Sequence, residues 1–248
     1  MSDSVKKMIN QQEVMQKIRN GEELYAVMSP CTRMPFVYCN PETYDDEVFI
    51  YFDKDGANKG ARWLLEGKNP IQLASIDKNS RLDFFTSLFP MGVNAVSVDK
   101  GLMYETGFQL EHLVRRHDAE QTPEGKVRIE NPELHLTSLY FAQEFRKNMG
   151  AKTELPEELK ELNEEMVVHF CKGKYIIAVE EEKGFPMLQK NKEVYQPVFT
   201  DIREFRKFNR EKKYGMVVVE YDKIRNIFTP ETKGVVLNPF GVDIILKI

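Results

Sequence analysis

The sequence predicts an α+β protein made of two tandem, diverged copies of a small unit that contains a sheet and helices. Two observations lead to this prediction. An amphipathic helix pattern, a glycine stop and a tyrosine-containing strand occur in this order at the start of each half of the chain. Further strand and helix patterns then follow in the same order in both halves. We therefore expect a first unit at residues 1–105, a second unit at residues 151–248, and a helical connector at residues 106–150.

Each copy begins with a helix that leads into a strand. Apolar residues recur with helical spacing from Val5 to Arg19, and Asn20-Gly21 is a typical helix stop. The same pattern spans Pro156–Cys171, where proline suits the first helical turn, and it ends at Gly173. Apolar strands are expected directly afterwards, at Leu24–Met28 and Tyr175–Val179.

The later elements match in order as well. We expect corresponding strands at Pro35–Tyr38 and Phe185–Leu188, Glu47–Asp53 and Tyr195–Asp201, Ile71–Asp77 and Met216–Asp222, Asn94–Gly101 and Gly234–Gly241, and Leu102–Tyr104 and Val242–Ile248. A helix should follow each strand that ends in aspartate, because this side chain accepts hydrogen bonds from the free N–H groups of a first turn. Asp201 with Glu204 resembles a capping box. The helix behind it presents Ile202, Phe205 and Phe208 on one side, which we expect to be buried.

The connector has a different character. A polar turn region at Asp118–Gly125 precedes an expected helix from Asn131 to Lys147, which Asn148-Met149-Gly150 should end. This helix carries several apolar residues, so the segment is too apolar to be a flexible tether. We expect it to pack on one or both copies.

Composition limits the classes of function. The 248 residues are 42% hydrophobic and 11% aromatic, which is ordinary for a folded globular protein. The 35 basic and 39 acidic residues give a net charge of −4, so we expect neither nucleic acid nor an anionic membrane as a partner. No apolar run approaches the roughly 18 residues that cross a bilayer.

The expected compartment is the cytoplasm. The N-terminal stretch leads into polar, helix-like sequence without the apolar core of a signal peptide. Only Cys31, Cys39 and Cys171 occur. An odd and sparse set of cysteines fits a reducing compartment, in which thiols act as small hydrophobic groups.

Two short patterns stand out in the second half. They are Pro-x-Phe-Thr at Pro197–Thr200 and Asn-Pro-x-Gly at Asn238–Gly241. With these patterns, residues 174–248 resemble the SseB-like N-terminal domain family, a small bacterial domain. The resemblance implies an α+β fold and no established catalytic residues. The first half departs from both patterns, with Tyr51-Phe52-Asp53 at the place of the first and Val98-Asp99 at the place of the second, so its membership depends on the internal alignment.

The residues of these patterns indicate architecture. Pro197 suits the start or edge of a strand, where its missing N–H costs nothing. Thr200 and Asp201 offer oxygen atoms to the free N–H groups of a helix start. Asn238-Pro239 is typical of a turn that joins two strands. A ligand-binding role for the same residues is the less favoured alternative.

No residue set indicates catalysis, a cofactor or a metal. The nucleophile elbow, the P-loop and the dinucleotide-binding glycine pattern are all absent from the sequence. Cys31 and Cys39 have no second pair for a zinc site. The tract Asp53–Asn58 lacks the glycine and glutamate positions of a calcium loop, so a helix cap explains it better. We therefore expect no catalytic residues, no cofactor and no bound metal.

The remaining candidate site is basic. Arg203, Arg206 and Arg210 fall on the side of the expected helix away from Phe205, and these arginines are our candidates for binding a protein partner. A solvated helix face is the plainer interpretation. The leading hypothesis is a non-catalytic interaction protein whose partner is another protein. The alternative is a small-molecule-binding protein or enzyme with a cleft between the two copies. The oligomeric state stays open.

Overall fold

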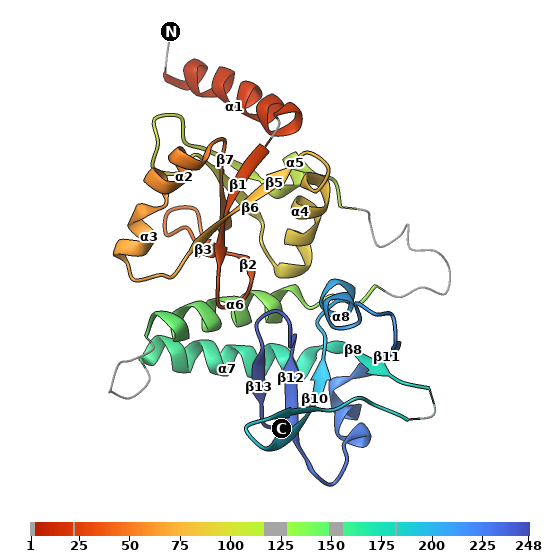
Figure 1. Cartoon of the computed structure of the whole chain (residues 1–248). Coiled ribbons are helices and arrows are strands. Elements are labelled where there is room, and N and C mark those ends of the chain that lie inside the picture. The colour runs from red at the N-terminus through yellow and green to blue at the C-terminus, as the bar shows by residue number, and fades with distance from the viewer. Residues whose placement is uncertain (1–2, 22, 117–127, 149–155, 182) are drawn as a thin grey trace. The chain divides into compact units, whose positions relative to one another are not determined.

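The computed structural model describes residues 3–21, 23–116, 128–148, 156–181 and 183–248, with side chains described from residue 11 onward (Figure 1). The chain divides into two compact units, made mainly of residues 1–117 and 118–248. Helices and sheets are mixed in both units, so the protein has the α+β fold class that the sequence predicts. The polar turn region expected at Asp118–Gly125 and the helix stop at Met149-Gly150 lie outside the described residues.

The first unit is built around one sheet. In chain order its main elements are α1 (Asp3–Asn20), β1 (Glu23–Ser29), β2 (Met34–Pro35), β3 (Val37–Cys39), β4 (Asp46–Tyr51), α2 (Lys54–Gly60), α3 (Arg62–Glu66), β5 (Gln72–Asp77), α4 (Arg81–Leu88), β6 (Ala95–Val98), β7 (Thr106–Gln109) and α5 (Leu110–Leu113). β1 runs antiparallel to β4 and β5, β4 runs parallel to β6, and β6 runs antiparallel to β7. β3 pairs with β4.

Apolar side chains of this sheet pack against α2 and α3. The buried cluster contains Val27, Phe36, Phe49, Tyr51, Ala57, Ala61 and Leu64. Trp63 of α3 packs its ring edge against Tyr38, with ring centroids 5.1 Å apart, and against Phe49 at 5.8 Å. Ile71 and Leu73 are partly buried against the same cluster. The start of strand β5 is therefore partly buried against the cluster that includes Leu64 of α3.

The second unit begins with two helices that pack on each other. In chain order its elements are α6 (Pro132–Lys147), α7 (Glu157–Lys172), β8 (Lys174–Val179), β9 (Leu188–Lys190), β10 (Glu193–Val198), α8 (Ile202–Phe208), β11 (Gly215–Glu220), a 3-10 helix (Tyr221–Ile227), β12 (Thr232–Leu237) and β13 (Ile244–Leu246). In α7, Leu159, Met166 and Phe170 form a buried stripe. The connector helix expected from the sequence is thus part of the second unit.

The strands of the second unit are connected as in the first. β8 runs antiparallel to β11 and touches β10 through one antiparallel bridge, Ile176 with Phe199. β10 runs parallel to β12, β12 antiparallel to β13, and β9 pairs with β10. The pairings among β1, β3, β4, β5, β6 and β7 therefore match those among β8, β9, β10, β11, β12 and β13. The origin of the two units by duplication stays a prediction.

Two expected strands are wrong. Leu102–Tyr104 forms a turn, because Asp99 and Gly101 have positive φ values of 53° and 77° and the Leu102 N–H donates to the Asp99 carbonyl. The last strand of the first unit is instead β7, which lies beyond the boundary expected at residue 105. Of the strand expected at Phe185–Leu188, only Leu188 belongs to β9, since Gly184 has a φ of 81° and Pro186 has no N–H to donate.

Candidate functional site

The two sequence patterns of the second unit meet where β10 and β12 end. Asn238 has a φ of 46°, in the left-handed region that asparagine tolerates. Its side-chain oxygen accepts from the Thr200 N–H at 3.0 Å, and its side-chain nitrogen donates to the Thr200 hydroxyl at 2.9 Å. Both residues are fully buried. The asparagine thus connects the end of β12 to the start of α8, which is an architectural role.

The first unit makes the same connection with other residues. Asp99 has a φ of 53°, and its carboxylate accepts from the Phe52 N–H at 3.3 Å. Its own N–H donates to the Ile50 carbonyl at 2.9 Å, as the Asn238 N–H donates to the Val198 carbonyl at 3.0 Å. Asp99 therefore occupies the place of Asn238. The sequence alignment placed Val98 opposite Asn238 and is wrong by one residue. The hydrogen bonds of the two turns show that Asp99 is the residue that corresponds to Asn238.

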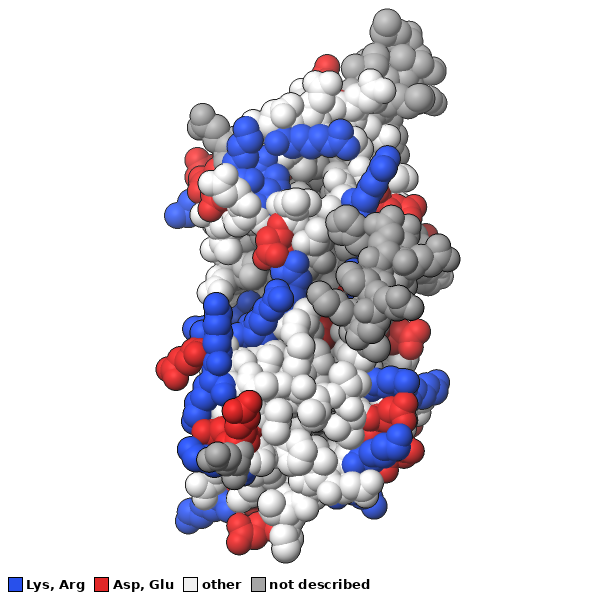
Figure 2. All heavy atoms as spheres, turned by 90° about the vertical axis from the view of Figure 1, so that its right-hand side faces the viewer, with Lys and Arg blue, Asp and Glu red and all other residues white. Residues whose placement is uncertain are grey.

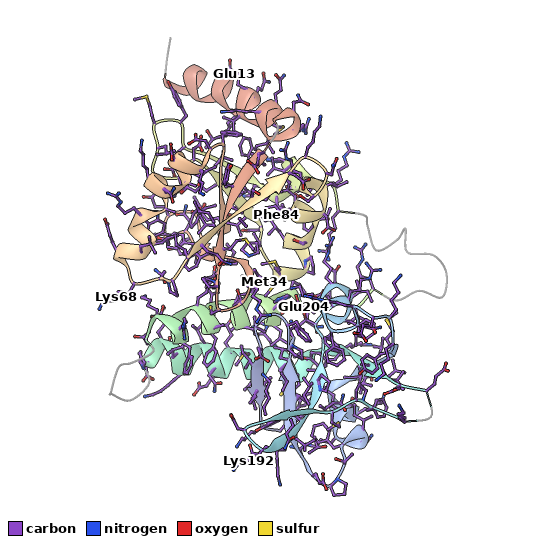
Figure 3. The ribbon with its side chains drawn as sticks, viewed as in Figure 1. Glu13, Met34, Lys68, Phe84, Lys192 and Glu204 are labelled. Carbon is purple, nitrogen blue, oxygen red and sulfur yellow. The ribbon has the colours of Figure 1, made fainter. Side chains whose placement is uncertain are left out.

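Aspartate caps the following helix in both units. Asp53 accepts from the Gly56 N–H at 2.7 Å, and Asp201 accepts from the Arg203 N–H at 2.8 Å. Glu204, labelled in Figure 3 on α8, binds Lys207 with its carboxylate. Among the described residues, its other carboxylate oxygen has no hydrogen-bond partner. Glu204 therefore does not make the reciprocal hydrogen bond of a capping box with that oxygen.

A buried group of His135, Thr200 and Asp201 has the residue types of a catalytic triad but not the geometry. His135 Nδ1 lies 3.3 Å from the Thr200 hydroxyl and 3.4 Å from the Asp201 carboxylate. The hydroxyl donates to that carboxylate at 2.8 Å. A triad needs the two ring nitrogens to serve the nucleophile and the acid separately, whereas here Nδ1 faces both. All three side chains are at most 2% exposed, so the group holds α6 against α8 and offers nothing to a substrate.

Burial and hydrogen bonding act in opposite directions on Asp201. Burial raises the pKa of its carboxyl group, but the bonds from His135, Thr200 and the Glu204 N–H stabilise the charged form. These bonds outweigh burial, and the pKa of Asp201 is lower than its ordinary value. The carboxylate therefore stabilises the folded second unit as long as it is ionised.

The structure separates the three predicted arginines. Arg203 is half-buried on α8 and has contacts of its own. Arg206 is exposed on the same helix. Helix α8 ends at Phe208, so Arg210 lies in the turn after the helix and not on the predicted face. The turn is fixed by Asn209, whose side-chain amide bonds the Tyr214 N–H at 3.0 Å and the Tyr214 carbonyl at 2.7 Å.

This turn builds a surface of aromatic rings and arginines. The ring of Phe208 stacks on Tyr214 at 5.4 Å and packs against Phe240 at 6.1 Å. The Arg210 guanidinium lies 6.0 Å from the centroid of Phe240, which is 42% exposed. We call Arg206, Phe208, Arg210, Tyr214 and Phe240 the aromatic–arginine surface. The sequence analysis missed Tyr214 and Phe240; the only signal for Phe240 was an aromatic residue within a turn motif.

The first unit has glycine at the corresponding positions. The aspartate caps align Gly60 with Phe208, and the left-handed residues align Gly101 with Phe240. A Cβ added at Gly101 would lie 3.2 Å from the Gly60 carbonyl oxygen, and one at Gly60 would lie 2.4 Å from the Lys100 carbonyl oxygen. The backbones at Gly60 and Gly101 thus approach each other closely, whereas the second unit has the rings of Phe208 and Phe240 at these positions. The aromatic–arginine surface is a feature of the second unit alone.

Within the described ranges, no group of three or more His, Cys, Asp or Glu side chains could hold a metal ion. All three cysteines lie in the described residues and none forms a disulfide, and the His169 Nε2 faces Glu165 at 3.3 Å. No helix in the described part of the chain is long and apolar enough to cross a membrane.

Comparisons with known proteins give weak similarities. No family model and no curated protein matches the chain. Among solved structures it is similar to Tic22 from Plasmodium falciparum, with 14% identity, 90% of each chain covered and a TM-score of 0.21. It is also similar to Anabaena Tic22, whose description names protein transport. The identity is 9%, 87% of this chain and 84% of that chain are covered, and the TM-score is 0.21. A TM-score this low carries no conclusion about fold or function.

Proposed function

We propose that the protein is a non-catalytic interaction protein and that the aromatic–arginine surface of its second unit binds an acidic segment of another protein. The observation that carries this proposal is the Arg210 guanidinium over the half-exposed ring of Phe240, beside the exposed Arg206. Arginine and aromatic residues are enriched where protein interfaces bind most strongly. Phe240 offers apolar area, and the guanidinium offers planar hydrogen-bond donors that match a carboxylate.

The charge of the surface supports an acidic partner. Lys207 is neutralised by Glu204 on the same helix. Within the described residues, neither Arg206 nor Arg210 is paired with a carboxylate, so both keep their charge for a partner. Since the whole chain is acidic, nucleic acid is a poor fit. In the same residues no observation favours the alternative of an enzyme or small-molecule-binding protein, because the His135 group is closed to solvent.

Affinity capture from native lysate tests the proposal. The charge reversal Arg206→Glu with Arg210→Glu should lose specific proteins that the unchanged chain retains, and so should Phe240→Gly, which restores the residue of the first unit. The matched control is Lys54→Glu with Lys59→Glu, an equal charge change on exposed positions of α2. Retained proteins should carry acidic segments and should be released by salt, because exposed ion pairs are screened. Identical sets of captured proteins in all four samples would refute the proposal.

We also propose that the chain is related to the SseB-like N-terminal domain family and acts in the cytoplasm. The Asn238–Thr200 hydrogen bonds support the relation, because they connect the two sequence patterns of the family in the folded unit. Three cysteines without a disulfide support a reducing compartment. A sequence profile built from that family, or localisation of a tagged chain, would test each part.

A further inference from the structure

The turn between β3 and β4 exposes an aromatic side chain that the fold does not use. Tyr44 is 80% exposed, the largest exposed fraction of any aromatic residue in the described part of the chain. Its φ is 60°, in the left-handed region where a bulky residue is strained and glycine is favoured. Neither burial nor backbone conformation therefore explains a tyrosine at this position. Strained positions of this kind are often found at functional sites.

The same turn holds an unpaired acidic group near the ring. The Tyr44 N–H donates to the Asn40 carbonyl and the Asn40 N–H to the Asp45 carbonyl, both at 2.8 Å. The Asp45 carboxylate accepts from the Gln109 side chain at 3.0 Å, which ties the turn to β7. Glu42 is exposed, and among the described residues its carboxylate has no ion pair. The turn thus presents a ring and a free carboxylate in a fixed conformation.

The other highly exposed apolar side chains lack such a carboxylate beside them. Met103 is 88% exposed and Tyr104 63%, but the neighbouring Glu105 is in an ion pair with a lysine. Leu82 is 67% exposed, but the neighbouring Asp83 has interactions of its own. In the described ranges, the β3–β4 turn is therefore the segment that best combines an exposed ring with an available negative charge.

The aromatic–arginine surface has the complementary properties. It offers the partly exposed ring of Phe240, and within the described residues its Arg206 and Arg210 are not paired with a carboxylate. A tyrosine ring packs well on another ring, and a glutamate accepts charge-assisted hydrogen bonds from a guanidinium. Figure 2 shows the side of Figure 1 that carries α8, with a broad uncharged area of the second unit bordered by charged side chains. The turn and the surface thus match in charge and in apolar character.

We propose that the acidic segment bound by the aromatic–arginine surface is the β3–β4 turn of a second copy of this chain, with Tyr44 on Phe240 and Glu42 at the arginines. This inference rests on the proposed function, because it names the partner of the same surface. The turn belongs to the first unit and the surface to the second, so the contact joins two different patches. Contacts of this type assemble copies head to tail, into a ring or an open chain.

Sedimentation velocity of the full chain across a concentration series tests the proposal. The unchanged chain should sediment faster as its concentration rises. Tyr44→Gly should stay monomeric, and its melting temperature should not fall, because glycine adopts a positive φ without steric cost. Tyr104→Gly is the control, since it removes an exposed tyrosine from another turn of the same unit, and it should associate like the unchanged chain. A monomeric unchanged chain, or association that survives Tyr44→Gly, would overturn the proposal.

Glu42→Gln tests the charge separately from the ring. It should weaken the association by up to about five-fold in Kd, because it removes one exposed ion pair and leaves Tyr44 in place. The fold should be unaffected, since Glu42 is exposed. Association of undiminished strength would contradict the pairing of Glu42 with the arginines.

A mixture of two variants shows whether the turn and the surface bind each other. Arg206→Glu with Arg210→Glu keeps the turn but loses the surface, whereas Tyr44→Gly keeps the surface but loses the ring of the turn. Neither variant should associate alone, and an equimolar mixture should form a one-to-one dimer and nothing larger. A mixture that stays monomeric contradicts the proposed contact.

The proposed function and this inference can fail separately. If the surface binds acidic segments of other proteins only, Arg206→Glu with Arg210→Glu changes the set of proteins captured from lysate, while the unchanged chain sediments as a monomer. If the captured sets are identical and the mixed dimer forms, the surface serves association between copies of this chain alone.

Discussion

At the scale of single residues, the two units solve one problem with different chemistry. Each needs a residue with positive φ whose side chain accepts a backbone N–H, and the residues are Asn238 and Asp99. The asparagine also donates to the Thr200 hydroxyl. In the first unit Phe52 stands at the position of Thr200 and has no hydroxyl group, so Asp99 needs no side-chain donor. Burial raises the pKa of Asp99, because the charged carboxylate is partly removed from water.

This difference predicts that exchanging asparagine and aspartate at the two positions changes the free energy of unfolding in opposite directions. Asn238→Asp should destabilise the second unit by about 1–3 kcal/mol, because it removes a buried donor and adds a second carboxylate near Asp201. Asp99→Asn should be neutral or stabilising above the ordinary carboxyl pKa range, since a neutral amide keeps the acceptor and needs no burial of charge. Urea unfolding of both variants at pH 7 measures this. Equal destabilisation by the two exchanges would show that the corresponding positions do not differ as described.

The lowered pKa of Asp201 predicts a dependence of stability on acidity. Its contribution is complete above the unfolded value, about 3.9, and is lost as the pH falls through the lower folded value. As the pH falls below about 4, the unchanged chain should therefore lose stability more steeply than the Asp201→Asn variant, because the asparagine amide does not take up a proton. Urea midpoints measured from pH 5 downward test this. Parallel curves for the two proteins would contradict it.

At the scale of elements, the sequence predicted what local rules determine. The helix from Pro156, the strand at Tyr175–Val179 and both aspartate caps follow from spacing and capping preference, and each is present. The end of α8 could not be predicted, because it depends on the Asn209 amide reaching the backbone of Tyr214. For the same reason the position of Arg210 over Phe240 was not foreseen. That contact joins segments thirty residues apart.

The buried side of α8 predicts where this element is sensitive. Phe205 is 5% exposed and packs its ring against Phe199 at 5.5 Å, so Phe205→Ala should cost about 3–5 kcal/mol. Reversal of Arg206 and Arg210 should change the unfolding free energy by no more than about 1 kcal/mol, because isolated surface charges contribute little. Arg206 and Arg210 are exposed as predicted, although Arg210 lies beyond the end of α8, whereas Arg203 is half-buried. Thermal melts of both variants provide the measurement.

At the scale of the whole molecule, shared connectivity hides different surfaces. The sequence predicted the order of elements in both halves because apolar periodicity repeats. It could not predict which half leaves the apolar side chains of its edge strand exposed, since that depends on which segments pack on the strand. The first unit has α3 at this point, and the second has a six-residue turn region between Phe208 and Gly215. The two units therefore share the connectivity of their strands and differ in what packs on them.

The single tryptophan gives this arrangement an optical consequence. Trp63 lies in the first unit, enclosed by Tyr38 and Phe49, and the chain contains no other indole. Its fluorescence should report the unfolding of the first unit alone, whereas far-ultraviolet circular dichroism reports both. Phe205→Ala should accordingly lower the midpoint seen by dichroism and leave the emission midpoint of Trp63 in place. If both midpoints shift together, the two cores unfold as one cooperative body.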